Sequence, residues 1–432
     1  MTERVNDIPT TVALVREAAL QPAALIDRTL SYIAERDSAI RAWSHIGAPD
    51  ALQRAAEAVD HTARLAGVPF GVKDVLNVAD MPTRFGARLL FRGDEPFDAA
   101  CVTRLRSAGA IPIGKTVTAE FAYKQPGLTV NPYDPSRTPG GSSSGSAAAV
   151  AAGMVPFALG TQTGGSIIRP AAFCGVAGFK PTFGAVERDG MKVVCESLDT
   201  IGWYAQSVCD LRSIAAELLS EEPTAEPARP PKVALALNYL HILDPDAREV
   251  LNDVVRLLRE HGALCADISV ADDLTQLASA HQVIMQYELA RSIAPIARRH
   301  AEHLSETLLK CVKRGQETDH AEYMDARAFQ REMADQWRRV AQGADFVLTP
   351  SVPGEAPRGL TNTGSSAFNV AWSVLGWPCL HLPHGLSRNG MPLGVQLVGQ
   401  RGSDMDLLGW GKWLERVIFT SRLRSGQQTT AF

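Results

Sequence analysis

Hydrophobic residues recur at three- and four-residue intervals through residues 11–66 of the chain. The repeat runs through Val15, Ala19, Ala23, Ala24, Leu30, Ile33, Ala51, Ala55 and Ala58. This spacing places them on one helix face, so it predicts two or three amphipathic helices that pack on a sheet. From residue 68 the pattern changes to short β-type stretches, VPFGVKDV and AIPIGKT, with a helical segment at residues 99–108 between them. This alternation is typical of α/β proteins.

The second half of the chain opens with an acidic, proline-rich segment at residues 220–232, which we expect to be an exposed connection. A strand (VALALN) follows, and a charged helical region at residues 281–342 predicts two long surface helices. Later stretches predict strands in DFVLTPSVPG, GWPCLHLPHG and MPLGVQLVG and a final helix at residues 404–419. Residues 220–345 are therefore interpreted as a subdomain or a peripheral insertion.

Composition narrows the class of protein. The 432 residues are 45% hydrophobic and 21% charged, which excludes global disorder, and the formal net charge of -4 without long charge runs argues against a nucleic-acid partner. Seven cysteines without CxxC spacing predict buried thiols rather than a disulfide framework or a metal site. The first twenty residues lack an apolar signal core, and the longest uncharged apolar run, residues 146–160, is too short to span a membrane. We therefore expect a cytoplasmic enzyme.

Two short motifs match catalytic patterns but conflict with their surroundings. Residues 109–116, GAIPIGKT, fit the phosphate-loop pattern GxxxxGK[ST], yet here an apolar stretch follows a helix-like VTRLRSA instead of a loop following a strand. Residues 141–145 fit GxSxG with Ser143 at the centre, and His381 or His384 could complete a triad. The preceding NPYDPSRTPG contains three prolines, which a buried central strand does not accommodate. Nucleotide hydrolysis and a nucleophile elbow are thus the weaker alternatives.

The run at residues 138–182 is rich in Gly, Ser, Thr and Ala, and its residues suggest a catalytic site. Its Gly164-Gly165 pair leaves backbone N–H groups uncovered beside Ser166, so these groups could surround a developing oxyanion, with Ser166 as nucleophile. A serine needs a neighbouring base, and this run contains no His or carboxylate. Lys73, in the apolar segment GVPFGVKDV, is the candidate, since burial lowers a lysine pKa toward the neutral form.

Together these segments resemble the amidase signature family, hydrolases that cleave carboxamides with a Ser-cisSer-Lys triad. The resemblance is strongest at residues 67–74 and 138–182 and returns at GKTVTAEFA and from GWPCL to LVGQ. It implies a single amidase domain over residues 1–432 with a signature core at about 67–182. The implied α/β fold has a mixed, mostly parallel central sheet covered by helices on both faces, with the catalytic residues on loops over one edge.

The resemblance also implies roles for individual residues. Lys73 falls on the family's lysine, Ser142 on its bridging serine and Ser166 on its nucleophile, while Ser143 matches a serine that helps to order the site. The implied oxyanion donors are the backbone N–H groups of Thr163, Gly164, Gly165 and Ser166. The implied reaction proceeds through an acyl-enzyme to a carboxylic acid and ammonia, without a metal or an organic cofactor. The implied partner is a small amide, and dimerisation is common among relatives, which leaves a homodimer open.

Two positions depart from the family pattern. Gln162 stands where most members carry Asp, and Ile168 where they carry Arg, so both partners of an ion pair are absent together. Arg169 follows, and TQTGGS-x-IRP resembles malonamidase, which acts on small amides bearing a carboxylate. We expect Arg169 to bind a substrate carboxylate, unless it pairs with a structural carboxylate or carbonyl, and Gln162 and Ser143 to line the substrate site. The predicted substrate is malonamate-like; the alternatives are neutral or aromatic amides and a role within an amidotransferase complex.

Overall fold

One sheet of eleven strands runs through the part of the chain that the structure, a computed structural model, describes: residues 7–87, 93–237, 240–268 and 271–424. The strand order is β1-β3-β2-β4-β6-β5-β10-β11-β9-β7-β8. The strands are β1 (Trp43–Ile46), β2 (Pro69–Lys73), β3 (Ile111–Thr116), β4 (Phe157–Gln162), β5 (Ala177–Lys180), β6 (Thr200–Ala205), β7 (Lys232–Leu235), β8 (Leu264–Asp267), β9 (Phe346–Pro350), β10 (Cys379–Leu386) and β11 (Pro392–Val398).

The sheet mixes both strand directions. β2 runs parallel to β3 and β4, and β7 runs parallel to β8 and β9. The other six neighbouring pairs among the described strands are antiparallel. The expected mixed sheet is confirmed, but the expectation of a mostly parallel sheet is wrong. Strand patterns do not report direction, and short connections such as residues 387–391 between β10 and β11 return the chain antiparallel.

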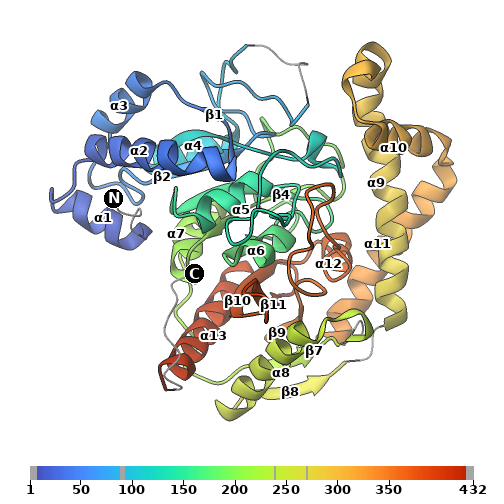
Figure 1. Cartoon of the computed structure of the whole chain (residues 1–432). Helices are drawn as coiled ribbons and strands as arrows, with labels where there is room; N and C mark the ends of the chain where they lie inside the picture. Colours follow the sequence, from blue (N-terminus) through green and yellow to red (C-terminus); the bar gives the residue numbers. More distant parts are fainter. Residues whose placement is uncertain (1–6, 88–92, 238–239, 269–270, 425–432) are drawn as a thin grey trace.

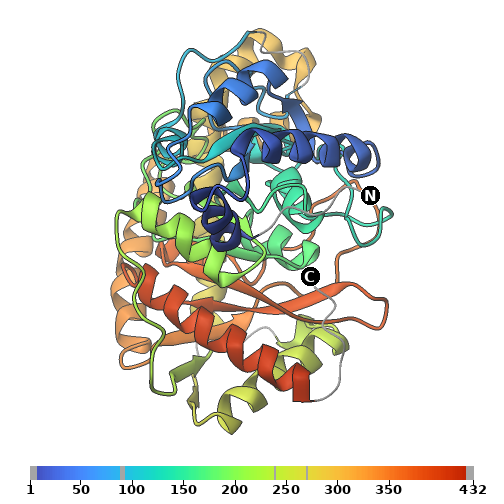
Figure 2. The ribbon, with the colours of Figure 1, turned by 90° about the vertical axis from the view of Figure 1, so that its left-hand side faces the viewer.

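Helices cover both faces of this sheet, as the resemblance to the family implied. They are α1 (Ile8–Arg16), α2 (Pro22–Ile40), α3 (Pro49–Glu57), α4 (Ala100–Ser107), α5 (Ser144–Ala151), α6 (Ile168–Cys174), α7 (Val208–Leu219), α8 (Pro245–Glu260), α9 (Ala271–His300), α10 (Glu306–Glu317), α11 (His320–Val340), α12 (Val370–Leu375) and α13 (Asp404–Arg424). α4, α7, α13 and α8 contact one another in series, and α7 and α13 lie in front of the strands in Figure 2. α5 and α6 pack together on the central strands.

The centre of the molecule is built from buried strands and a helix of small residues. β2 and β4 are buried along their whole length, as expected of strands covered on both faces. In α5, a Cβ added to Gly145 would lie 2.2 Å from the Ala42 carbonyl oxygen and 2.4 Å from the Val117 nitrogen. Only glycine permits this approach, which brings the serines just before α5 close to β2 and β4.

Residues 220–345 contribute to both the sheet and the wall of helices beside it. β7 and β8 continue the sheet beyond β9, and α9, α10 and α11 stand together at one side of the molecule (Figure 1). The sequence predicted two long helices here, whereas the chain breaks at residues 301–305 and 318–319 to form three. The segment therefore supplies two strands at one edge of the sheet, and its helices α9 and α10 line one side of a pocket. Among the described helices, none combines the length and apolar character needed to cross a membrane.

Candidate active site

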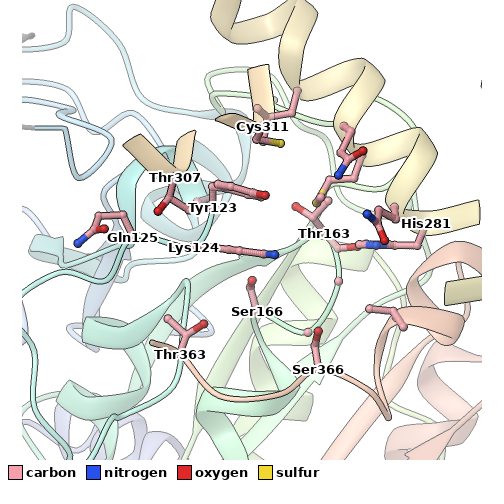
Figure 3. A pocket seen from close by; sticks show the side chains of 18 of the residues that line it. Tyr123, Lys124, Gln125, Thr163, Ser166, His281, Thr307, Cys311, Thr363 and Ser366 are labelled. Carbon is pink, nitrogen blue, oxygen red and sulfur yellow. The ribbon is translucent and has the colours of Figure 1, made fainter. Parts of the chain in front are cut away.

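A pocket of about 1060 Å³ opens between the centre of the sheet and the helices at its side (Figure 3). Its floor is the loop of residues 163–166, between β4 and α6. The other walls are residues 122–125, the loop of residues 361–366, and side chains of α9 and α10. Ser166 is 7% exposed and faces this space, so the predicted nucleophile lies where a ligand could reach it.

The carbonyl groups of residues 163–166 all bond to protein donors. The Thr163 carbonyl accepts from His281 Nε2 at 3.1 Å, and the Gly164 carbonyl accepts from Ser373 Oγ at 2.7 Å. The Gly165 carbonyl accepts from the backbone N–H of Arg169, and the Ser166 carbonyl accepts from the Tyr204 hydroxyl, both at 3.0 Å. A carbonyl can only accept, so Nε2 of His281 carries the proton, and burial lowers the pKa of this imidazole to about 4, which keeps it neutral. The loop is thereby fixed by its carbonyl side.

The N–H groups of the same loop remain available. Gly164, Gly165 and Ser166 donate no backbone hydrogen bond to any residue that the structure describes. Because the N–H and C=O of one peptide point in opposite directions, binding the carbonyls to the protein turns these N–H groups the other way. A Cβ on Gly165 would lie 2.7 Å from Asn369 Oδ1, so the loop packs this closely only with glycine. The arrangement can hold a negatively charged oxygen beside Ser166.

Lys73 and Ser142 meet behind this loop. Lys73 Nζ donates to Ser142 Oγ at 2.8 Å and to Thr161 Oγ1 at 2.7 Å, and both Lys73 and Ser142 have no exposed surface. The Gly141–Ser142 peptide is cis. Burial lowers the pKa of Lys73 to about 7, against a smaller opposing effect of the Asp199 carboxylate. Lys73 can therefore be neutral, and so act as a proton acceptor, near physiological pH.

Arg169 is bound to the protein rather than free in the pocket. Its Nε and Nη2 donate to the Gly141 carbonyl at 3.2 and 2.6 Å, and Nη1 donates to the Gly364 carbonyl at 2.8 Å. Its backbone N–H also bonds Gly165, so Arg169 joins the segments that carry Ser142 and Ser166. These contacts match the alternative that Arg169 pairs with structural carbonyls. Because Arg169 also lines the pocket, its binding of a substrate carboxylate stays a prediction.

Gln162 and Ser143 were also expected in the substrate site, and the structure places both behind the pocket wall. Each has no exposed surface. Gln162 Oε1 accepts from the N–H groups of Ile167 and Ile168 at 2.8 and 3.1 Å, which orders the first turn after the nucleophile. Ser143 Oγ exchanges hydrogen bonds with the backbone of Thr161, at 3.1 and 3.2 Å. These contacts make Gln162 and Ser143 positioning residues, which corrects the expectation.

The two weaker motifs have structural roles. Lys115 of GAIPIGKT lies inside β3, fully buried, 3.4 Å from the Asp74 carboxylate and 2.7 Å from Thr83 Oγ1, so no phosphate loop forms. Ser143 of the GxSxG match is buried, and His381 pairs with Ser351 at 2.6 Å. Within the described ranges, no group of three or more His, Cys, Asp and Glu side chains is placed to hold a metal ion.

The sequence did not identify several residues that support the site. They come from distant segments and include Tyr204, Asp199, His281 and Ser373. Asp199 accepts from the Thr163 hydroxyl at 2.5 Å, and Ser373 links Gln162 to the Gly164 carbonyl. None of the four belongs to the Gly/Ser-rich run, and no local pattern distinguishes them from other buried polar residues.

Comparisons with known proteins show which family the chain resembles. The family model described as Amidase matches residues 24–408. A glutamyl-tRNA(Gln) amidotransferase subunit from Chloroflexus aggregans is 32% identical, over 91% of this chain and 92% of the relative. A crystal structure of an amidase superposes with a TM-score of 0.87 at 29% identity, covering 96% of this chain and 100% of that one. The peptide amidase of Stenotrophomonas maltophilia has a TM-score of 0.79 at 27% identity, covering 96% and 97%. This chain belongs to the amidase signature family.

Proposed function

We propose that this protein hydrolyses a small carboxamide to a carboxylic acid and ammonia, with Ser166 as nucleophile and Ser142 and Lys73 as the proton path. The observation that carries the proposal is the pairing of Ser166, beside three available N–H groups, with a buried Lys73–Ser142 hydrogen bond of 2.8 Å. The direct test is ammonia release by the purified protein from a panel of malonamate, succinamate, acetamide, propionamide, benzamide and glutamine.

The proposed reaction balances its protons through the two serines. Ser166 Oγ attacks the amide carbon as its proton moves to Ser142, whose own proton passes to neutral Lys73. The N–H groups of Gly164, Gly165 and Ser166 stabilise the tetrahedral oxyanion. The C–N bond then breaks, and the proton returns through Ser142 to the leaving nitrogen, which departs as ammonia. Water repeats the sequence on the acyl ester, releasing the acid and restoring the Ser166 hydroxyl.

The charge of the pocket supports a substrate with a negative group, such as a malonamate-like monoamide of a dicarboxylic acid. Five basic residues line the pocket, against one acidic lining residue, Glu317. The basic residues are Lys124, Arg169, Lys310, Lys313 and Arg314. A positive pocket attracts an anionic substrate and raises its local concentration. We expect a higher kcat/KM on malonamate and succinamate than on acetamide, propionamide and benzamide. The reverse order would favour a neutral or aromatic amide as the substrate.

A second candidate is a role within an amidotransferase complex, which the similarity to the Chloroflexus aggregans relative over nearly the whole chain favours. The two candidates differ in what the isolated chain does. A self-sufficient amidase releases ammonia from small amides without another protein. The amidotransferase role would be favoured if glutamine were the one substrate of the panel that is hydrolysed, and if its rate of hydrolysis rose when a second protein is added.

Tyr204→Phe is expected to lower kcat about fivefold, because it removes the hydroxyl that holds the Ser166 carbonyl and costs about 1 kcal/mol in positioning. Tyr32→Phe is the matched control. It also deletes a buried hydroxyl that donates to a backbone carbonyl, that of Ala152 at 3.3 Å, on a helix away from the pocket. Ammonia release and thermal melting of both variants make the comparison. Equal kcat values for the two variants would contradict the positioning role of Tyr204.

Arg169→Gln is expected to lower kcat by about 10- to 100-fold on neutral and carboxylate-bearing amides alike. The reason is that Arg169 joins Gly141 to Gly165 and so sets the relation between Ser142 and Ser166. The measurement is kcat and KM on succinamate and on butyramide, which has the same number of carbon atoms but no carboxylate. A rise in KM confined to succinamate would instead restore Arg169 as the group that binds the substrate carboxylate.

A further inference from the structure

Lys124 reaches into the pocket from the wall opposite Thr163. Figure 3 shows its side chain pointing into the pocket on the side of Ser166, while Thr163 and His281 come from the other side. The positive charge of Lys124 also contributes to the lowered pKa of His281, so its field reaches across to the oxyanion loop. Lys124 therefore lies within electrostatic range of a ligand bound at Ser166.

The turn before Lys124 is held in an uncommon backbone conformation. Phe121 and Ala122 have φ angles of 46° and 55°, in the left-handed region that L residues rarely adopt. Such residues persist where the surrounding structure holds them. Phe121 is fully buried and stacks on Phe85, with ring centroids 5.7 Å apart. The turn thus directs the following residues toward the pocket.

A second contact fixes this turn against the neighbouring helix α10. The Glu120 carboxylate accepts from the backbone N–H of Ser305 at 3.0 Å and from its hydroxyl. Ser305 is the N-terminal cap of α10, where its own hydroxyl accepts from the Leu308 N–H at 3.2 Å. This contact therefore fixes the position of the turn before Lys124 relative to the basic residues of α10.

Two of the basic residues on α10 already have acidic partners. Lys310 Nζ lies 2.6 Å from the Glu306 carboxylate, and Lys313 Nζ lies 3.9 Å from that of Glu317. In each pair the lysine and the glutamate lie one helical turn apart on the exposed side of the helix, and their opposite charges neutralise each other. Their positive charges are thus less available to a ligand.

Lys124 and Arg314 differ from these paired residues. Among the residues that the structure describes, neither has a carboxylate within 4.0 Å; Lys124 Nζ lies 5.6 Å from the centre of the Tyr123 ring. Both line the pocket, and the charge of Arg314 acts on Tyr123, the residue next to Lys124 in the chain. Two cations without an anionic partner, in the pocket that also contains Ser166, fit a ligand that supplies the negative charge.

We propose that Lys124, assisted by Arg314, binds the carboxylate of the substrate while Ser166 attacks the amide at the other end, an inference that rests on the proposed function. Lys124 is then the specificity-determining residue of this enzyme, in place of Arg169, whose donors hold backbone carbonyls. The substrate is a short chain that extends from the oxyanion loop to the wall formed by residues 122–125 and α10.

The test compares Lys124→Met, which keeps the length of the side chain, with Lys124→Arg, which keeps its charge. The kcat/KM of Lys124→Met on succinamate is expected to fall at least about tenfold, mainly through KM, while that on butyramide changes less than about twofold. Lys124→Arg is expected to retain most of the activity on both. Lys232→Met is the control for net charge, because it removes an exposed lysine from β7, outside the pocket.

A binding measurement separates this inference from the proposed function. Calorimetric titration with succinate is expected to show at least about tenfold weaker binding to the double variant Ser166→Ala, Lys124→Met than to Ser166→Ala alone. Equal losses on succinamate and butyramide, or no loss on either, would overturn the role of Lys124 and leave the hydrolase intact. If the wild-type protein hydrolyses neither amide, the proposed function fails. Unchanged succinate affinity in the double variant would then overturn the inference as well.

Discussion

Ser166→Ala is expected to lower kcat for ammonia release by a factor of about 10⁴ or more, because no acyl-enzyme can form without the hydroxyl. The residual rate would come from the N–H groups of the oxyanion loop, which the substitution leaves in place. The measurement is steady-state ammonia release over the amide panel. Intact-mass spectrometry of wild type and variant adds a direct readout, because only the wild type can carry a trapped acyl group.

Ser366 provides the matched control for this substitution. It lines the same pocket, and Figure 3 shows it on the wall below Ser166, but it has no part in the proposed proton path. Ser366→Ala should keep kcat within about threefold, as expected for a side chain outside the reaction. Both variants should melt close to the wild type. A Ser166→Ala protein that keeps a tenth of the activity would remove Ser166 as the nucleophile.

Lys73→Met is expected to lower kcat/KM by about 10² to 10⁴, the usual contribution of a positioned general base. It should also abolish a pH dependence. Because burial lowers the pKa of Lys73 to about 7, the neutral base is scarce below this pH and dominant above it. Wild-type kcat/KM should therefore rise with pH up to about 7 and then level off. The neutral imidazole of His281, with a pKa of about 4, does not titrate in this range.

The same shift predicts the pH dependence of stability. In the unfolded chain Lys73 stays protonated up to about pH 10.5, whereas in the folded protein it releases its proton near pH 7. The unfolded state binds more protons between these values, so the free energy of unfolding of the wild type should rise there by up to about 1.4 kcal/mol per pH unit relative to Lys73→Met. Chemical denaturation at several pH values measures this difference. A constant difference would contradict the lowered pKa.

Lys115→Met is the contrasting variant for Lys73. Lys115 is also buried and also has a lowered pKa, of about 8, but its partner is the buried Asp74 carboxylate. Removing Lys115 leaves that carboxylate without its partner, at a cost of about 3 to 5 kcal/mol of stability. At pH 7 we expect Lys115→Met to lower the melting temperature strongly, and Lys73→Met, which leaves no ion-paired carboxylate behind, to lower it much less.

Local patterns along the chain predicted many of the elements. The helical spacing at residues 99–108 corresponds to α4 (Ala100–Ser107), and the apolar run around Lys73 corresponds to β2. The helical pattern beyond residue 281 did not separate α10 from α11, because both are charged and amphipathic and the break between them is only two residues long. Strand direction also escaped prediction, since it depends on which distant strand becomes the neighbour.

Short stretches of sequence were enough to predict the candidate chemistry: a glycine pair before Ser166, a serine run beginning at Ser142, and a lysine in an apolar segment. Which polar side chains reach the pocket depends on the packing of distant segments. Gln162 and Ser143 have the polarity of ligand-binding residues, yet both are enclosed by α5, α6 and the central strands. Nε and both terminal nitrogens of Arg169 each donate to a carbonyl, and these carbonyls lie 28 and 195 residues away along the chain. The physical reason is that a side chain's type sets which bonds it can form, whereas burial and partners are set by segments distant in the sequence.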